Sequence, residues 1–287
     1  MDGIIIINKE KGYTSHDVVA KVKKILNEKK VGHTGTLDPN ATGVLPILLG
    51  KGTKLSKYLI NHNKIYEATL KLGEKTDTAD IEGKIIEEKD VKKENLSKEN
   101  IAKILQEFIG KSKQVPPMYS AIKVNGKKLY EYARKGQTIE IKPREIEIYS
   151  IELLKINNNE ITFRVHCSKG TYIRTLCENI AEKLETVGYM KDLKRIEVGK
   201  FNIKNAITLK ELESKKEKAV ISIEDFLKDK NTITLNIKKL NLFLNGVNLK
   251  VEQVDGVYRI YNEKSEFIGT GTIKNNILKR DIIVWQI

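Results

Sequence analysis

Short apolar runs at the start of the chain alternate with one amphipathic segment, a pattern that predicts strands beside a helix. Residues 4–7 are four consecutive isoleucines, which is typical of a buried strand. Apolar residues then recur at helical spacing after Thr14, and Asp17 stands three positions later, as in a capping box. Residues 44–49 predict a second buried strand, and a short helix is expected over residues 53–60.

Alternating and helical patterns continue through the middle of the chain. Residues 65–72 and 161–168 alternate apolar with polar positions, and each predicts a half-buried strand. Helical stripes lie at residues 101–109, where Gly110 ends the pattern, and at residues 173–184. Strands and helices therefore mix throughout, which predicts an α/β (α+β) fold.

Three segments break the pattern by their polarity. Residues 84–100 are dense in charge and predict a solvated excursion. Residues 114–136 combine two adjacent prolines with tyrosines and basic residues, which indicates an exposed arm that makes contacts. Residues 208–231 are charged and weakly periodic, which is typical of a domain boundary.

Behind that boundary the spacing of strands and turns changes. Short strands are expected at residues 257–261, 267–273 and 282–285, separated by turn signals, and this spacing predicts a small β-barrel. We therefore divide the chain into a domain of residues 1–231, whose arm covers about residues 114–136, and a module of residues 232–287.

Composition excludes several classes of protein. The 287 residues are 40% hydrophobic, which is enough to form a core, yet no apolar run approaches the roughly 18 residues of a membrane span. The N-terminus has no secretory pattern, and two cysteines, Cys167 and Cys177, are too few for a disulfide framework or a zinc site. We expect a soluble cytoplasmic protein without a metal, with both cysteines in its core.

The chain is strongly basic, since 52 Lys+Arg against 38 Asp+Glu give a net charge of +14. Such a surplus favours a polyanionic partner, first of all nucleic acid and less an anionic membrane surface. Lysine outnumbers arginine more than six to one. Because genomic base composition also produces lysine-rich chains, a merely decorated surface remains an alternative.

The densest candidate for chemistry is the glycine-rich stretch of residues 32–43. Asp38 lies within it, and Pro39 restricts Asp38 to an extended or turn conformation. A carboxylate on a stiff loop is well placed to act as a nucleophile or base, although an Asp that only caps local N–H groups would look the same. Neither a Walker A motif nor a complete dinucleotide-binding fingerprint is present elsewhere.

Arg174 is the second candidate, because it falls in the first turn of a predicted helix. The helix dipole disfavours a cation there, so its position predicts an anionic partner, either a buried carboxylate or a phosphate. An ordinary surface arginine is the alternative. His33 has no metal-binding cluster around it, and in a basic protein it is a candidate for stacking on a base, as is Tyr66 on its strand.

Six segments, in this order, resemble the TruB-type tRNA pseudouridine-55 synthases, and the resemblance covers nearly the whole chain. Residues 8–15 resemble the N-terminal motif of that family, with Glu10 where proline is usual. The other segments are residues 32–46 (the active-site motif), 64–66 (a Lys-x-Tyr segment), 114–134 (the RNA-gripping thumb), 167–174 (the motif with the arginine) and 267–271 (part of a PUA domain).

This resemblance implies a mixed-sheet pseudouridine synthase domain with a β-barrel-like PUA module, and isomerisation of a uridine in the T-loop of tRNA without a cofactor. It implies that Asp38 is the catalytic carboxylate and that Arg174 pairs with it and keeps it ionised. Tyr66 would stack on the flipped base and assist proton transfer. The remaining residues that the resemblance assigns to substrate binding are His33, which fills the gap left by the base, Tyr172, Leu193 and Lys9.

Two other functions remain open from the sequence. A non-catalytic tRNA-binding or tRNA-folding protein would use the same basic surface, and guide-RNA-dependent relatives share the Asp38 loop. The segment at residues 126–134 and the absence of long tails resemble the bacterial branch instead. We therefore expect an enzyme that acts on the T-arm of tRNA as a monomer, with no guide RNA, metal or membrane as partner.

Overall fold

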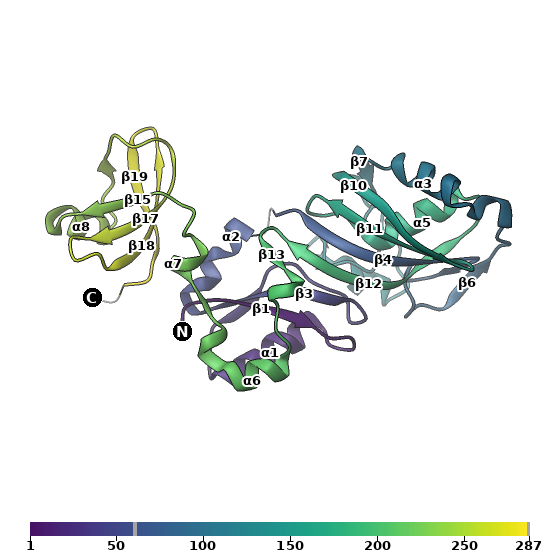
Figure 1. Cartoon of the computed structure of the whole chain (residues 1–287), viewed down its shortest axis with the longest axis horizontal. Coiled ribbons are helices and arrows are strands. Elements are labelled where there is room, and N and C mark those ends of the chain that lie inside the picture. The colour runs from purple at the N-terminus through teal and green to yellow at the C-terminus, as the bar shows by residue number, and fades with distance from the viewer. Residues whose placement is uncertain (60–61, 286–287) are drawn as a thin grey trace.

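A long mixed sheet forms the body of the protein in the computed structural model, which describes residues 1–59 and 62–285 (Figure 1). Its main path runs through β14 (Ile221–Ser222), β1 (Gly3–Lys9), β3 (Thr42–Leu49), β12 (Gly188–Val198), β4 (Lys64–Leu72), β11 (Glu160–Cys167), β10 (Arg144–Asn157) and β7 (Gly110–Gln114). Two short strands, β2 (Val31–His33) and β13 (Phe201–Asn202), pair with β3 and β12. The β12–β3 pairing is parallel and the other pairings are antiparallel, so the expected mixed sheet is confirmed.

The helices are short and lie mostly against this sheet. They are α1 (Ser15–Leu26), α2 (Ser56–Leu59), α3 (Lys98–Gln106), α4 (Leu129–Ala133), α5 (Ile173–Lys183), α6 (Leu209–Lys215), α7 (Ile223–Phe226) and α8 (Ile237–Leu244). In the described part of the chain they are accompanied by the 3₁₀ helices η1 (Gly50–Leu55), η2 (Lys93–Leu96), η3 (Ile203–Asn205) and η4 (Lys216–Ala219). Within the described residues, no helix is long and apolar enough to cross a membrane.

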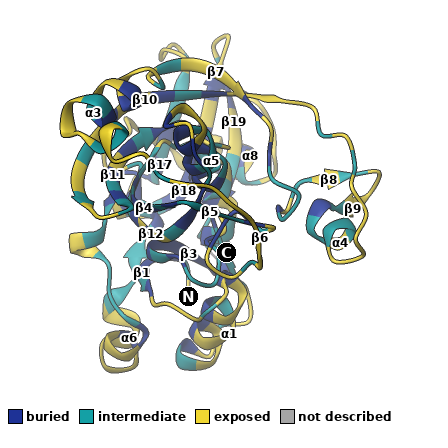
Figure 2. Ribbon diagram, turned by 90° about the vertical axis from the view of Figure 1, so that its right-hand side faces the viewer, coloured by how far each residue is buried: buried dark blue, intermediate teal, exposed yellow. Residues whose placement is uncertain are grey.

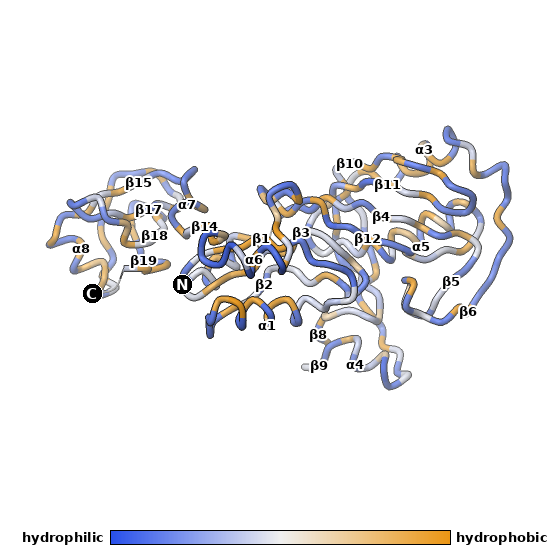
Figure 3. The backbone as a smooth tube through the Cα atoms, turned by 60° about the horizontal axis from the view of Figure 1, so that its bottom comes forward, coloured by the Kyte–Doolittle hydropathy of each residue, from blue (hydrophilic) through white to orange (hydrophobic). Residues whose placement is uncertain are grey.

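The isoleucine run is apolar at every position because β1 is buried on both faces. Ile5 and Ile7 belong to the larger core, which contains α1, α3 and α5, whereas Ile4 and Ile6 belong to a second core on the opposite side. Strands buried on both faces read as continuous hydrophobic runs. β1 and β3 accordingly carry hydrophobic stretches side by side (Figure 3).

Most local predictions are confirmed. Thr14 and Asp17 form the capping box at the start of α1, with reciprocal bonds between side chains and backbone. The helix expected over residues 53–60 is instead the 3₁₀ helix η1 followed by α2, and residue 60 lies outside the described part of the chain. The excursion at residues 84–100 also holds β6 (Ile85–Glu88), which pairs with β5 (Glu74–Thr76).

The charged segment at residues 208–231 is more ordered than its sequence indicates. It contains α6 and α7, and β14 between them joins the edge of the main sheet beside β1. Its charges lie on the exposed sides of these short elements. The segment is therefore part of the main body, and a new sheet begins at β15 (Thr232–Leu235).

The C-terminal region is a separate five-stranded sheet with α8 beside it. Its strand order is β15, β17 (Gly256–Asn262), β18 (Phe267–Lys274), β19 (Ile277–Ile283) and β16 (Leu249–Lys250). In the described residues the strand path is open, so no closed barrel forms. The last strand starts directly after the turn at Asn275 and Asn276, five residues before its predicted start at residue 282.

This C-terminal sheet is attached to the body through the region of α2. The carboxylate of Asp281 accepts hydrogen bonds from Lys57 and Tyr58, and Lys51 Nζ donates to the Val284 carbonyl at 2.8 Å. Ile282 joins the core that lies under β1 and α7. The attachment thus combines ionic and apolar contacts.

The arm at residues 114–136, here called the thumb, projects from the body, as Figure 2 shows at β8 (Lys123–Val124), β9 (Lys127–Lys128) and α4. β8 and β9 pair only with each other. Leu129 is fully buried, whereas most residues around it are exposed or half-buried. The prediction of an exposed arm is confirmed.

Candidate active site

A pocket of about 500 Å³ lies between the loop after β2, the thumb and the start of α5. Five of the seven predicted site residues line it: Asp38, Tyr66, Tyr172, Arg174 and Leu193. Asp38 and Leu193 lie 155 positions apart in the chain, 193 against 38. The fold therefore assembles most of the predicted site in one place.

The loop that carries Asp38, here called the catalytic loop (residues 34–41), is held by side chains beneath it. Ser15 Oγ accepts a hydrogen bond from the Leu37 N–H at 2.9 Å and donates to the Leu37 carbonyl at 3.1 Å. Ser15 is buried at the start of α1, so the helix fixes the residue next to Asp38. The Ala41 N–H donates to the Asp38 carbonyl at 3.0 Å, which closes the turn at Pro39.

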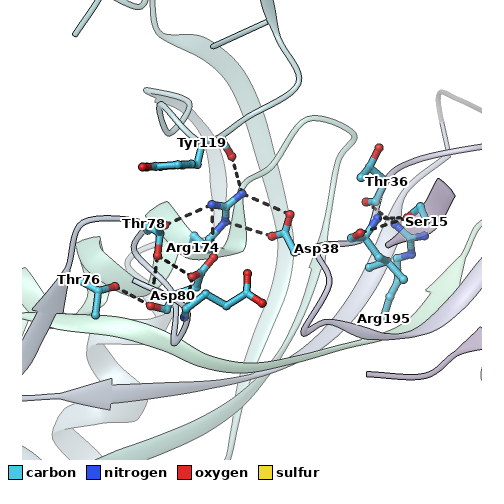
Figure 4. A network of polar contacts seen from close by, with 11 residues as sticks. Ser15, Thr36, Asp38, Thr76, Thr78, Asp80, Tyr119, Arg174 and Arg195 are labelled. Atoms are coloured by element: carbon cyan, nitrogen blue, oxygen red, sulfur yellow. Dashed lines mark hydrogen bonds and ion pairs between the residues drawn. The ribbon is translucent and has the colours of Figure 1, made fainter. Parts of the chain in front are cut away.

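Arg195 holds the other end of the catalytic loop and was not identified from the sequence. Its guanidinium donates to the carbonyls of Val44 (2.8 Å), Gly35 (3.1 Å) and Thr36 (3.4 Å), and only 1% of the residue is exposed. Gly35 has φ +85°, a left-handed backbone conformation that favours glycine. Figure 4 shows Arg195 next to Thr36 and Ser15.

Lys9, expected to bind substrate, lies outside the pocket and supports the catalytic loop instead. Its ammonium group donates to the carbonyls of Tyr13 (2.6 Å), Pro39 (3.0 Å) and Glu10 (3.1 Å). The residue is fully buried, and three carbonyl partners account for all three N–H donors. In this structure its role is therefore to stiffen the turn beside Asp38.

Arg174 contacts Asp38 as predicted (Figure 4). Its Nε lies 3.2 Å from Asp38 Oδ2, and its Nη2 lies 3.5 Å from Oδ1, a two-pronged arrangement. The side chain of Arg174 is 7% exposed whereas that of Asp38 is 36% exposed, so the carboxylate is the more accessible partner of the pair. The anionic partner inferred from the helix dipole is thus a carboxylate.

A second carboxylate, Asp80, holds Arg174 from the other side and was missed by sequence reasoning. Its Oδ2 lies 3.5 Å from Arg174 Nη1, and the carbonyls of Thr78 (3.2 Å) and Tyr119 (2.8 Å) accept the other donors. Thr78 Oγ1 in turn donates to Asp80 Oδ1 at 2.6 Å. Arg174 is therefore fixed by a network rather than by one pair.

The expected electrostatic effect of Arg174 is outweighed by burial. Burial raises the pKa of the Asp38 carboxyl above its usual value, Arg174 opposes this rise, and the negative charge of Asp80 adds to it. Arg174 thus aims the carboxylate and limits the rise of its pKa, but it does not hold the pKa below the ordinary value. A carboxyl with a raised pKa is a better base once ionised.

Three apolar or aromatic residues complete the walls of the pocket. Tyr66 on β4 and Leu193 on β12 are 8% and 7% exposed, and β4 and β12 are neighbours in the sheet. Tyr172 precedes α5, where its backbone is fixed by the side chain of Gln114 through bonds of 2.8 and 3.0 Å. A flat apolar group would fit between such walls.

His33 lies at the end of β2 and does not line the pocket. Its ring makes an edge contact with His16, with ring centres 5.4 Å apart, and His16 does line the pocket. Burial lowers the pKa of His33, and the neighbouring His16 and Arg195 lower it further, so the ring is neutral near pH 7. Its predicted base-filling role stays a prediction.

Both cysteines lie in the core of the protein. Cys167 and Cys177 are both free and buried, as expected of core residues, and burial raises the pKa of Cys167 to about 11. In the described ranges, no group of three His, Cys, Asp or Glu side chains could hold a metal ion.

Arg195 and Asp80, which were not identified from the sequence, differ in how clearly the sequence indicates them. Arg195 could have been found by the argument applied to Arg174, because arginine is scarce in this chain and tends to be retained where a planar donor is needed. Asp80 lies in a charged stretch that gives no such signal. Its importance arises only from its contact with Arg174.

Comparison with known families identifies two matching models. The first, described as the N-terminal domain of TruB family pseudouridylate synthase, matches residues 23–173. The second, described as the tRNA pseudouridylate synthase B C-terminal domain, matches residues 174–232.

Curated relatives resemble the chain over nearly its whole length. The tRNA pseudouridine synthase B of Clostridium kluyveri is 46% identical over 96% of this chain and 96% of its own. The enzymes of the same name from Clostridium novyi and Mesoplasma florum are 45% and 44% identical, over 97% and 96% of this chain and 98% and 96% of their own.

Solved structures show the same fold in larger assemblies. One similar chain belongs to an H/ACA RNP bound to a substrate RNA containing 2′-deoxyuridine, with a TM-score of 0.70 and 25% identity over 99% of this chain and 85% of that chain. Another belongs to a Cbf5-Nop10-Gar1 complex, with a TM-score of 0.69 and 26% identity over 99% of this chain and 84% of that chain.

Proposed function

The chain belongs to the TruB family of pseudouridine synthases, and we propose that it isomerises the uridine at position 55, in the T-loop of tRNA. Enzymes of this family convert uridine to pseudouridine, and the relatives act on tRNA by name. The observation that carries the proposal is the carboxylate of Asp38, which is held in place yet reachable from the pocket.

Asp38 is the catalytic carboxylate in this proposal. Of the described residues that line the pocket, it alone carries a carboxylate. The reaction breaks the bond between N1 of uracil and C1′ of the ribose, turns the base and joins C5 to C1′. The C5 proton leaves and N1 gains one, so the atoms balance without a co-reactant. Asp38 acts at the ribose, at the uracil ring or on a ribose proton.

The neighbouring residues then have distinct roles. Arg174 is a positioning residue, because its two-pronged contact fixes where the carboxylate points. Tyr66 stacks on the uracil and assists proton transfer at C5, while Tyr172 and Leu193 line the pocket. These side chains exclude water from the reacting base.

The target uridine must leave its stack to reach this pocket, at a cost of roughly a few kcal/mol. His33 fills the vacated position in this proposal, since it lies beside the pocket-lining His16. The surplus of 14 positive charges provides contacts with tRNA phosphates, so binding weakens as salt rises. The thumb and a PUA-like module at residues 232–287 grip the folded arm. We place the enzyme in the cytoplasm as a monomer that needs no guide RNA.

The experiment is to incubate the purified protein with a T-arm transcript and to map pseudouridine in the RNA. We expect conversion at one T-loop uridine with no guide RNA or partner protein added. Conversion only after a guide RNA is added would overturn the stand-alone activity. Tight binding without conversion would favour the non-catalytic tRNA-binding function.

A further inference from the structure

Lys64 lines the same pocket, and neither the mechanism nor the support of the catalytic loop uses it. It is the first residue of β4, two positions before Tyr66, so both side chains lie on the same face of the strand. A methyl group added at Gly35 would lie 3.9 Å from Lys64 Cε, which places the lysine next to the catalytic loop.

The hydrogen bonds of Lys64 are incomplete, unlike those of Lys9. Both ammonium groups are partly or fully removed from water, and burial lowers the pKa of each to about 8. Lys9 donates to three carbonyls, whereas among the described residues Lys64 donates to one, the His62 carbonyl at 2.6 Å. An ammonium group has three donors, so two donors of Lys64 are available to a ligand.

The charges around Lys64 favour an anion. Arg195 from β12 and Lys169 from the loop after β11 are the cations that act on it, and both lower its pKa. Cys167 on β11 is neutral near pH 7, because burial raises its pKa to about 11, and His62 is also neutral because burial lowers its pKa. In the part of the chain that the structure describes, no carboxylate lies within ion-pair distance of Lys64. A half-buried ammonium group without a carboxylate partner, such as that of Lys64, is costly unless a ligand neutralises it.

We propose that Lys64 binds a backbone phosphate next to the uridine that enters the pocket. The proposal rests on the proposed function, since it takes RNA as the ligand. Uracil and ribose are uncharged, so phosphate is the anion that the RNA brings. A base stacked on Tyr66 leaves its sugar–phosphate backbone within reach of a lysine about 7 Å away along the strand.

The first test measures binding of a T-arm stem–loop that already contains pseudouridine, so that no turnover is needed. Lys64→Met keeps the apolar stem and removes the charge, and we expect about tenfold weaker binding and a salt dependence reduced by about one ion. The matched control is Lys71→Met, on the same strand but the opposite face. Equal losses in both variants, or none in Lys64→Met, would overturn the proposal.

The second test locates the phosphate. Neutral methylphosphonates replace, one at a time, the phosphates on either side of the target nucleotide. One replacement is expected to weaken binding of the unmodified enzyme about tenfold and to have no further effect on Lys64→Met. If both replacements weaken the binding of Lys64→Met as much as they weaken the binding of the unmodified enzyme, the assignment is overturned.

The third measurement uses pH and keeps the proposal testable if Lys64→Met fails to fold. Affinity is expected to fall as pH rises through 8, because Lys64 loses its proton there and the phosphate contact requires the charge. Lys64→Arg stays charged and retains affinity at pH 9, so a fall as steep as in the unmodified enzyme would overturn the proposal. If the unmodified enzyme binds the RNA without converting it, the proposed function is refuted, but the affinities of the Lys64 variants can still be compared.

Discussion

The two sides of the pocket are built in opposite ways. The catalytic loop is braced from below by Lys9, Ser15 and Arg195, which between them bind carbonyls at four of its positions. The thumb is bonded to the body near its base, through Gln114 and the carbonyls of Val115 and Tyr119. From residue 122 onward, the described hydrogen bonds of the thumb stay within residues 120–137. Asp38 thus sits on a rigid wall, whereas the opposite wall makes few hydrogen bonds with the body.

The largest effect is expected when the carboxylate of Asp38, the group that we propose to react, is removed from the rigid wall. Asp38→Asn preserves the shape of the side chain, so tRNA binding should stay nearly intact. Turnover should fall about a thousandfold or more, because the amide cannot act as nucleophile or base. Tritium release from tRNA labelled at uridine C5 measures it. Full turnover by this variant would remove Asp38 from the mechanism.

The next largest effect is expected for the support of that wall. Arg195→Met removes the donor of three carbonyls, of which that of Val44 is buried and those of Gly35 and Thr36 are partly buried, and the free energy of unfolding should fall by about 3 kcal/mol. Urea denaturation measures the loss. The control is Arg164→Met, whose side chain is 44% exposed and pairs with Glu67 and Glu152 on the surface, where about 0.5 kcal/mol is expected. Similar losses in the two variants would contradict the bracing role.

A smaller effect concerns the network behind Arg174. Asp80→Asn removes a negative charge that raises the pKa of Asp38, so the acid limb of the pH–rate profile should move to lower pH. Because Arg174 also loses a charged partner, kcat should fall about tenfold. Glu82→Gln neutralises an exposed carboxylate on the same turn and serves as the control. An acid limb that moves to higher pH would contradict the assignment.

The smallest effect on the fold is expected in the thumb. Tyr130 lines the pocket and packs against Lys128 and Arg134 within the thumb. Tyr130→Ala should change the free energy of unfolding by less than about 0.5 kcal/mol, because few contacts with the body are lost. Its KM should rise about threefold with kcat unchanged, which steady-state kinetics would show. A large loss of stability would mean that the thumb is as firmly braced as the catalytic loop.

Local features of the fold could be predicted because neighbouring residues produce them. The capping box of Thr14 and Asp17, the strand at residues 161–168 and the helical face after Tyr172 depend on spacing along the chain, and the structure confirms them. The structure of the segment at residues 208–231 was harder to predict. Its helices are short and charged, and β14 exists only because the edge of β1 is there to pair with it.

The same division holds for the site. The sequence by itself indicated a carboxylate on a stiff loop at Asp38 and a cation that needs an anion at Arg174, because proline geometry and the helix dipole are local effects. Only the tertiary structure brought Asp80 to Arg174, buried Lys9 under the loop and left Lys64 facing the pocket with donors to spare. The partner of a charged side chain depends on how strands that are distant in the sequence pair with each other. Here β12 reaches the catalytic loop because it pairs in parallel with β3, where Gly43 leaves room for the backbone of Arg195.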